Sequence, residues 1–266
     1  MIKNLSSLLL IYTGGTIGMK VDPADGALKP FDFSQILSEV PEILKFACKI
    51  DVHSYNPLID SSDVETGLWV SLVELIKENY NKYDGFVILH GTDTMAYTAS
   101  AVSFMLENLS KAVVFTGSQL PIGVPRTDGR ENLISAIEIA SAHDENGHSI
   151  VPEVSIFFAG TLVRANRATK INAEEFSAFR SYNYPPLATA GVKIRYNHPA
   201  IHSFYDWGYG LEVSTKLDTR VSILKIHPAI TESVARNVLL AEGCRAVIIE
   251  TYGSGNAPSK GWFISL

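Results

Sequence analysis

Residues 8–19 read Leu-Leu-Leu-Ile-Tyr-Thr-Gly-Gly-Thr-Ile-Gly-Met, and they contain the clearest indication of the fold. The apolar run 8–11 is too short and too branched for a helix, so it predicts a strand that is buried on both faces. The strand ends in a turn that presents Thr13 and Thr16 among glycines. Ligands of open α/β sheets bind beyond the carboxyl ends of the strands, where glycines allow close backbone approach. The turn is therefore either a ligand site or a tight structural turn whose threonines bond to the backbone.

A second turn of the same kind follows the apolar residues 86–89, which also predict a buried strand. It reads His-Gly-Thr-Asp-Thr (90–94) and precedes a helical pattern over 96–106. The carboxyl ends of parallel strands meet at one edge of a sheet, so we expect Thr16 and Thr92 along the same edge. The pair of turns favours a ligand site more strongly than either turn alone.

The rest of the chain alternates between short apolar runs and helical patterns. We expect further strands over 50–55, 112–115, 154–158, 221–226 and 246–250, and helices over 33–37, 66–80, 134–139 and 231–241. This order predicts an α/β fold with a doubly wound parallel sheet of the flavodoxin or Rossmann type. We expect an N-terminal α/β domain at 1–190, a proline-broken linker at 191–219 and a smaller, incomplete α/β domain at 220–266. The polar segment 20–30 is long enough to form a mobile lid.

The composition narrows the class of protein. The chain has 266 residues, of which 46% are hydrophobic and 19% are charged, as is usual for globular proteins. A net charge of -6 without a basic stripe argues against a nucleic-acid partner. No stretch has the length of a membrane span, and the start lacks a signal-peptide pattern. Cys48 and Cys244 form no CxxC motif and have no histidine close in sequence, so we expect neither a metal site nor a disulfide, and a cytoplasmic protein with reduced thiols.

The two turns contain groups that suit acyl transfer. A threonine hydroxyl is a poor nucleophile unless a base takes its proton and hydrogen-bond donors stabilise the oxyanion. Thr16 can attack a carbonyl carbon, and Thr92 can relay a proton or activate water. The backbone N–H groups of the glycine turns, at Gly15 and Gly91, can bind the oxyanion.

The base is less clear from the residues alone. Lys170 can serve if burial and the neighbouring Arg164 and Arg167 disfavour its ammonium form, although a lone lysine is more often a solvated surface residue. His90 is an alternative, but a histidine at the end of a buried strand is more often structural. The G-x-S-x-G, P-loop and H-E-x-x-H motifs are absent, and the remaining glycine clusters support dinucleotide binding only weakly.

The segments Tyr-Thr-Gly-Gly-Thr-Ile-Gly (12–18) and His-Gly-Thr-Asp-Thr-Met (90–95) together resemble the two signatures of bacterial-type L-asparaginases. Similarities at 60–63, 115–119, 166–170 and 252–256 extend the resemblance over essentially the whole chain. The form of the signatures is most similar to the cytoplasmic type I branch. The resemblance implies hydrolysis of L-asparagine to L-aspartate and ammonia through an acyl intermediate on threonine, without a cofactor.

The resemblance also assigns catalytic roles. It matches Thr16 to the nucleophile of the family, and it matches Thr92, Asp93 and Lys170 to the second catalytic group. These assignments place the catalytic residues in the N-terminal domain.

The substrate site and the assembly follow from the same resemblance. Asp93 would also hold the α-ammonium group of the substrate, while Ser61 and Ser62 would hold the α-carboxylate and neighbouring groups. A zwitterion needs an acceptor at one end and neutral donors at the other, so this division suits the chemistry. The turns at Gly15 and Gly91 complete the expected substrate site, and the family implies a homodimer or homotetramer.

Two departures from the family pattern accompany the resemblance. Many members carry a tyrosine on the loop after the first signature, whereas residues 26–28 here are Gly-Ala-Leu. Relatives are also expected to continue past residues 263–264, so the C-terminal part is expected to be truncated. Two alternative functions remain: a subunit of an amidotransferase that acts on Glu-tRNA(Gln), and an inactive amino-acid-binding protein.

Overall fold

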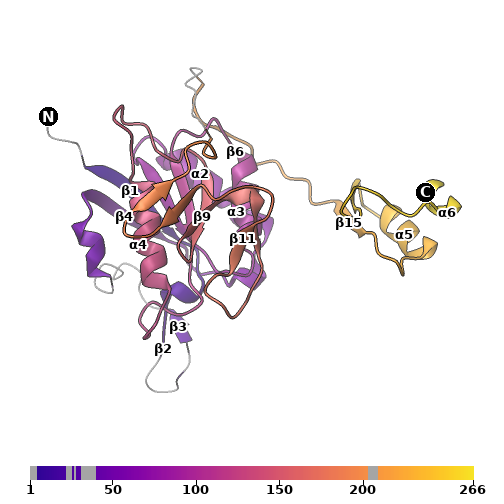
Figure 1. Ribbon diagram of the computed structural model, residues 1–266, viewed down its shortest axis with the longest axis horizontal. Helices are drawn as coiled ribbons and strands as arrows, with labels where there is room; N and C mark the ends of the chain where they lie inside the picture. The colour runs from indigo at the N-terminus through magenta and orange to yellow at the C-terminus, as the bar shows by residue number, and fades with distance from the viewer. Residues whose placement is uncertain (1–4, 22–25, 27, 31–39, 203–208) are drawn as a thin grey trace. The chain divides into compact units, whose positions relative to one another are not determined.

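The apolar run 8–11 forms the middle of strand β1 (Ser6–Tyr12), which lies inside an eight-stranded sheet in the computed structural model (Figure 1). The structure describes residues 5–21, 26, 28–30, 40–202 and 209–266. Five neighbouring strands are parallel, in the order β4 (Cys48–Ser54), β1, β5 (Gly85–Leu89), β7 (Ala112–Thr116) and β8 (Val154–Phe158). In chain order this arrangement is 2-1-3-4-5, the order of flavodoxin-like sheets. The predicted α/β fold with a parallel sheet is confirmed.

Antiparallel strands extend this sheet beyond β8. They are, in order, β9 (Thr161–Arg164), β12 (Ala188–Ala190) and β13 (Ile194–Tyr196). Within the described residues, two-stranded sheets join β2 (Met19–Val21) to β3 (Leu28–Pro30), β6 (Leu106–Glu107) to β14 (Glu212–Val213), β10 (Ala168–Lys170) to β11 (Phe179–Ser181), and β15 (Val221–Lys225) to β16 (Ala246–Glu250).

Helices of both the α and 3-10 types connect the strands. The α-helices are α2 (Thr66–Asn79), α3 (Met95–Met105), α4 (Gly129–Ala140), α5 (Glu232–Leu239) and α6 (Gly261–Ile264). The 3-10 turns are η1 (Thr16–Gly18), η3 (Pro41–Lys45), η4 (Ser61–Asp63) and η5 (Ala165–Arg167). None of the helices among the described residues combines the length and the apolar character that crossing a membrane requires.

The central strands present apolar side chains to both faces of the sheet. In β1, Leu8 and Leu10 belong to the core on the side of α4, whereas Leu9 and Ile11 belong to the core on the side of α2 and α3. The helices therefore cover both faces and give a three-layer arrangement. This arrangement explains why residues 8–11 are apolar at every position rather than at alternate positions.

The segment 191–219, predicted as a linker, contains two strands. The strand β13 pairs with β12 in the central sheet, and β14 pairs with β6. The contacts divide the chain into two compact units, Met1–Thr215 and Lys216–Leu266, so most of this segment lies within the first unit. Strands of two or three residues carry too weak a periodic pattern to be read from sequence. The expected domain limits themselves stay a prediction.

The second unit has a small core of its own. Its strands β15 and β16 are parallel and pack against α5 through Leu224, Ile226, Ile230 and Ala235. The Thr231 side chain caps α5 by accepting a hydrogen bond from the N–H of Val234.

Two expectations fall on parts of the chain that the structure leaves undescribed. The predicted helix over 33–37 lies outside the described residues. Residues 22–25 and 27 of the predicted lid also lie outside them, so the lid stays a prediction.

Candidate active site

The first turn is fixed to the neighbouring strand by Thr13, which is buried. Both its N–H and its Oγ1 donate to the carbonyl oxygen of Leu89, at 3.0 and 2.9 Å, and its own carbonyl accepts from the N–H of Ile59 at 2.8 Å. Because Leu89 ends β5, these bonds hold the ends of β1 and β5 together. Thr13 therefore has a structural position.

The next residues bring the two turns into contact. Gly15 has a φ of +92°, and a Cβ atom on it would lie 2.6 Å from the Cα of Gly91. Only a glycine allows this conformation and this approach without strain. Thr16 follows at the start of η1 and is half-exposed, and within the described part of the chain its hydroxyl makes no hydrogen bond. The turns lie between β1 and β5, where the strand order of the sheet reverses and where ligands of such folds bind.

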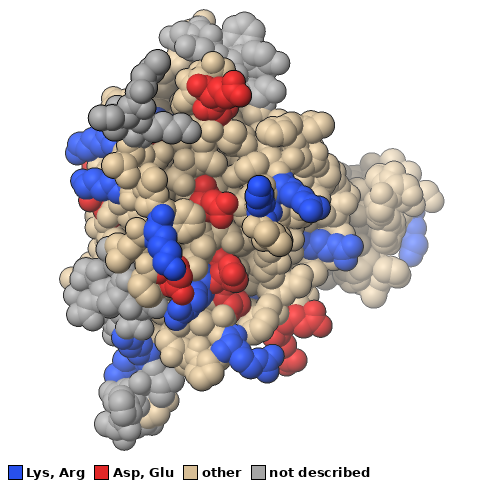
Figure 2. Space-filling model, turned by 60° about the vertical axis from the view of Figure 1, so that its left-hand side comes forward, with Lys and Arg blue, Asp and Glu red and all other residues tan. Residues whose placement is uncertain are grey.

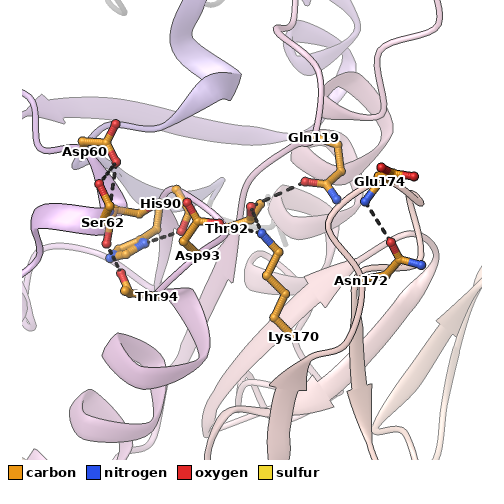
Figure 3. Close-up of polar contacts among 12 residues, drawn as sticks. Asp60, Ser62, His90, Thr92, Asp93, Thr94, Gln119, Lys170, Asn172 and Glu174 are labelled. Carbon is orange, nitrogen blue, oxygen red and sulfur yellow. Dashed lines mark hydrogen bonds and ion pairs between the residues drawn. The ribbon is translucent and has the colours of Figure 1, made fainter.

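The second turn carries a connected polar cluster, which Figure 3 shows. Lys170, the last residue of β10, donates from Nζ to the Thr92 hydroxyl at 2.8 Å and to Asp93 Oδ1 at 2.7 Å. The Lys170 side chain is only 18% exposed, whereas that of Asp93 is 62% exposed. A largely buried ammonium group is thus held between a hydroxyl and a solvent-facing carboxylate. The structure brings together the three residues that the resemblance grouped, and their roles stay predictions.

The expected arginine neighbours of Lys170 are not its hydrogen-bond partners. Arg164 instead forms two hydrogen bonds with the carboxylate of Glu153, at 2.5 and 3.1 Å, and a third with the Ala200 carbonyl. The hydrogen bonds to Glu153 hold the pKa of the Arg164 guanidinium above its usual range. Arg164 therefore has a carboxylate partner of its own in Glu153, and the charged group that contacts Lys170 is the Asp93 carboxylate.

The η4 turn lies against the second turn. A Cβ atom on Gly91 would lie 2.5 Å from the Cβ and the Oγ of Ser61, and the Ser61 carbonyl accepts from the Thr94 hydroxyl at 2.6 Å. Ser61 is buried, whereas Ser62 is exposed and donates from N and Oγ to Asp60 at 2.9 and 2.8 Å. The Ser62 donors lower the pKa of the Asp60 carboxyl. Ser61, and with it the η4 turn, thus lies against the turn that carries Thr92.

His90 is buried beneath this turn. Its Nδ1 lies 2.8 Å from the Gly91 carbonyl, its Nε2 has no hydrogen-bond partner among the described residues, and burial lowers its pKa. These features fit the structural interpretation of His90 rather than a base in contact with substrate.

Gln119 is a contact of Thr92 to which the sequence assigned no role. The Thr92 hydroxyl donates to Gln119 Oε1 at 3.5 Å, and Gln119 Nε2 donates to the Glu175 carbonyl at 3.1 Å. Gln119 follows β7, the next parallel strand after β5. Its position at the carboxyl end of a strand is the sequence feature that could have identified it as a site residue.

A cavity of about 670 Å³ opens beside the cluster. Asp93 and Lys170 line it together with Trp69, Tyr97 and Ile171. Its size suits a small-molecule ligand, but Thr16, Thr92 and Ser61 are not among the residues that line it. The described residues contain no group of three or more histidine, cysteine, aspartate or glutamate side chains arranged to hold a metal ion.

Comparison with known proteins identifies the family. The family described as "Asparaginase, N-terminal" matches residues 7–202. L-asparaginase 1 of Escherichia coli K12 is 43% identical over 266 residues, which cover 97% of this chain and 74% of that protein. The crystal structure of L-asparaginase I from Vibrio cholerae superposes with a TM-score of 0.87 at 40% identity and covers 98% of this chain and 76% of that one. A human 60 kDa lysophospholipase is 41% identical over 95% of this chain and 46% of its own length.

This fold and these similarities define the class of the protein, which is an α/β hydrolytic enzyme with paired threonine turns. The chain belongs to the asparaginase family of amidohydrolases, and its resemblance to the type I branch is confirmed. A glutamyl-tRNA(Gln) amidotransferase component from Pyrococcus abyssi is more distant, at 33% identity over 96% of this chain and 58% of that protein.

Proposed function

We propose that this protein hydrolyses L-asparagine to L-aspartate and ammonia through an acyl intermediate on Thr16. The contact between the Thr16 turn and the turn that carries Thr92 and Asp93, to both of which Lys170 of β10 donates, is the observation that supports this proposal most strongly. Family membership supports the same reaction, since the similar E. coli and V. cholerae proteins are named L-asparaginases.

The proposed reaction has two steps. The Thr16 hydroxyl attacks the side-chain amide carbon of the substrate and gives up its proton, and backbone N–H groups of the turns stabilise the oxyanion. The C–N bond then breaks as the leaving nitrogen takes a proton, which releases ammonia and leaves an aspartyl ester on Thr16. In the second step water attacks the ester, restores the hydroxyl and releases L-aspartate. Thr92 and Lys170 pass the protons, because they form the one hydrogen-bonded hydroxyl and amine pair at this edge among the described residues.

The substrate is held by its charged ends in this proposal. Asp93 is an exposed carboxylate beside the cavity and binds the α-ammonium group. Ser61 and Ser62 lie at the start of η4 and bind the α-carboxylate through neutral donors.

Ammonia release from L-asparagine tests the reaction. The wild-type protein is expected to turn over, and Thr16→Ala is expected to lose at least about 10³-fold in kcat, because removing a nucleophile leaves only binding and oxyanion stabilisation. The Thr13→Val variant serves as the matched control. An inactive wild-type protein that still binds L-aspartate by calorimetry would favour the amino-acid-binding alternative, and equal rates for wild type and Thr16→Ala would overturn the role of Thr16.

We also propose a homodimer or homotetramer. Tyr97 and Phe104 are seven residues apart on α3, so they face the same side of the helix, and they are 69% and 70% exposed. Large exposed apolar side chains of this kind mark interaction surfaces. Analytical ultracentrifugation is expected to show a species larger than a monomer, and a monomer at micromolar concentration would contradict this.

The proposed setting is the cytoplasm, without a membrane or nucleic-acid partner. Cys48 and Cys244 are both free, and burial raises the pKa of the Cys48 thiol, which suits a reducing compartment. On the face that Figure 2 shows, basic and acidic side chains are interspersed and form no continuous basic stripe.

A further inference from the structure

The turn that carries Gln119 is held by Asp128, the residue just before α4, and we call this contact the clamp. Both oxygens of the Asp128 carboxylate accept from the N–H of Gln119, at 3.1 and 3.0 Å, and one of them also accepts from the N–H of Leu120 at 3.1 Å. A carboxylate that receives several backbone N–H bonds fixes the path of that backbone strongly, because charge-assisted hydrogen bonds are stronger than neutral ones.

Asn132 lies in α4, four residues after Asp128, and its side chain holds this carboxylate in place. Its side chain is buried, and its Nδ2 donates to Asp128 Oδ2 at 3.2 Å and to the Gly117 carbonyl at 2.9 Å. Its Oδ1 accepts from the N–H of Ala159, just after β8, at 3.0 Å. The same amide therefore joins the ends of β7 and β8, and its bonds to both sides fix its orientation.

The clamp reaches the candidate active site through the Gln119 side chain. Because Gln119 Nε2 donates to a carbonyl, that of Glu175, its Oε1 is the atom that faces Thr92. Lys170 in its ammonium form can only donate to Thr92, so the proton of the Thr92 hydroxyl points towards Gln119. Gln119 thus sets the direction of this hydroxyl, and Asp128 sets the position of Gln119.

We propose that Asp128 and Asn132 are positioning residues that, through Gln119, keep the Thr92 hydroxyl oriented so that it accepts the hydrogen bond from Lys170. Neither residue contacts the cluster of Thr92 and Lys170 directly. This inference rests on the proposed function, in which Thr92 and Lys170 pass protons.

The Asp128→Asn variant tests the clamp. Asparagine has the same size and serves equally well near a helix N-terminus, but it replaces one oxygen with an amide group that cannot accept from an N–H. We expect kcat to fall about 10- to 100-fold, since small misplacements of catalytic groups have effects of this size, with KM changed by less than about threefold.

The matched control is Asp144→Asn. The Asp144 carboxylate also accepts two backbone N–H bonds, from Asn146 and His148, at 2.8 Å each, but it lies in the loop after α4. Its replacement is expected to leave kcat unchanged. An equal loss of kcat in both variants would mean that such carboxylates matter only for general stability and would overturn the inference.

A double-mutant cycle tests the route through Gln119. We expect Gln119→Ala to lower kcat by itself, and we expect Asp128→Asn to cause no further loss in that background. Independent, multiplying effects would overturn the route. Gln119 is only partly buried, so its variant keeps the route testable if Asp128→Asn fails to fold.

An NMR measurement separates this inference from the proposed function. In protein labelled at threonine methyl groups, Asp128→Asn is expected to shift the Thr92 methyl resonance, and Asp144→Asn is expected to leave it in place. This readout needs no turnover, so it holds even if wild-type protein releases no ammonia from L-asparagine. An unmoved Thr92 resonance in Asp128→Asn would contradict the positioning role.

Discussion

Replacing Gly91 with alanine directly tests the packing between the second turn and η4. The new Cβ would lie 2.5 Å from both the Cβ and the Oγ of Ser61 and 3.4 Å from its backbone N. Non-bonded carbon atoms prefer a separation of about 3.5–4.0 Å, so one segment must move by about 1 Å. Rotating the Ser61 side chain brings no relief, because its Cβ is itself in contact. The hydrogen bond from Thr94 to the Ser61 carbonyl also resists the movement.

Two effects of Gly91→Ala are expected. Overpacking of this kind lowers the free energy of unfolding by about 1–3 kcal/mol. Displacing a substrate-positioning residue by about 1 Å lowers kcat/KM for L-asparagine by about 10²-fold. Urea unfolding and ammonia-release kinetics measure the two effects on the same preparation.

The matched control is Gly67→Ala in the first turn of α2, where a Cβ would meet no heavy atom within 4 Å. It is expected to leave kcat/KM unchanged and to stabilise the protein by up to about 1 kcal/mol, since alanine favours the helix over glycine. A Gly91→Ala variant with wild-type stability and kcat/KM would refute the packing argument.

Three further predictions concern stability. Thr13→Val is expected to lower the free energy of unfolding by about 1 kcal/mol and to leave kcat within about threefold, because the Leu89 carbonyl keeps its bond from the backbone N–H of residue 13. Glu153→Gln is expected to cost about 3 kcal/mol in urea unfolding, since it leaves the largely buried Arg164 guanidinium without its carboxylate; an unchanged midpoint would contradict this. Burial lowers the pKa of His90 below its usual 6.5, so the unfolded chain binds a proton at a higher pH than the folded protein does. The free energy of unfolding therefore decreases as the pH falls below about 6.5. His90→Gln is expected to lack this contribution to the decrease, and identical pH profiles of unfolding for the variant and the wild type would disprove it.

The sequence predicts the meeting of the two turns for a physical reason. The runs 8–11 and 86–89 are apolar at every position, which indicates strands buried between layers, and parallel strands end at a common edge. The contact between Gly15 and Gly91 follows from that topology. The sequence assigns the chemistry to Thr16, and the structure shows that the Thr13 hydroxyl is engaged with the backbone of β5.

The features that sequence reasoning missed depend on contacts between distant residues. Arg164 was expected to act on Lys170 because the two are close in the chain, but it pairs with Glu153, which directly precedes β8, the antiparallel neighbour of β9. Strand β13 (Ile194–Tyr196) has only three residues, so its pairing in the central sheet leaves no periodic pattern in the sequence. The clamp of Asp128 on the turn at Gln119 likewise depends on how α4 packs, which local propensities do not encode.

Trapping the acyl intermediate shows whether Thr16 is the nucleophile. Protein mixed with L-asparagine is quenched in acid during turnover, digested and analysed by tandem mass spectrometry. The peptide containing Thr16 is expected to gain the mass of one aspartyl group, with the fragment ions placing it on that residue, and Thr16→Ala is expected to show no such gain. An aspartyl group on Thr92, or full turnover by Thr16→Ala, would contradict the role of Thr16 as the nucleophile.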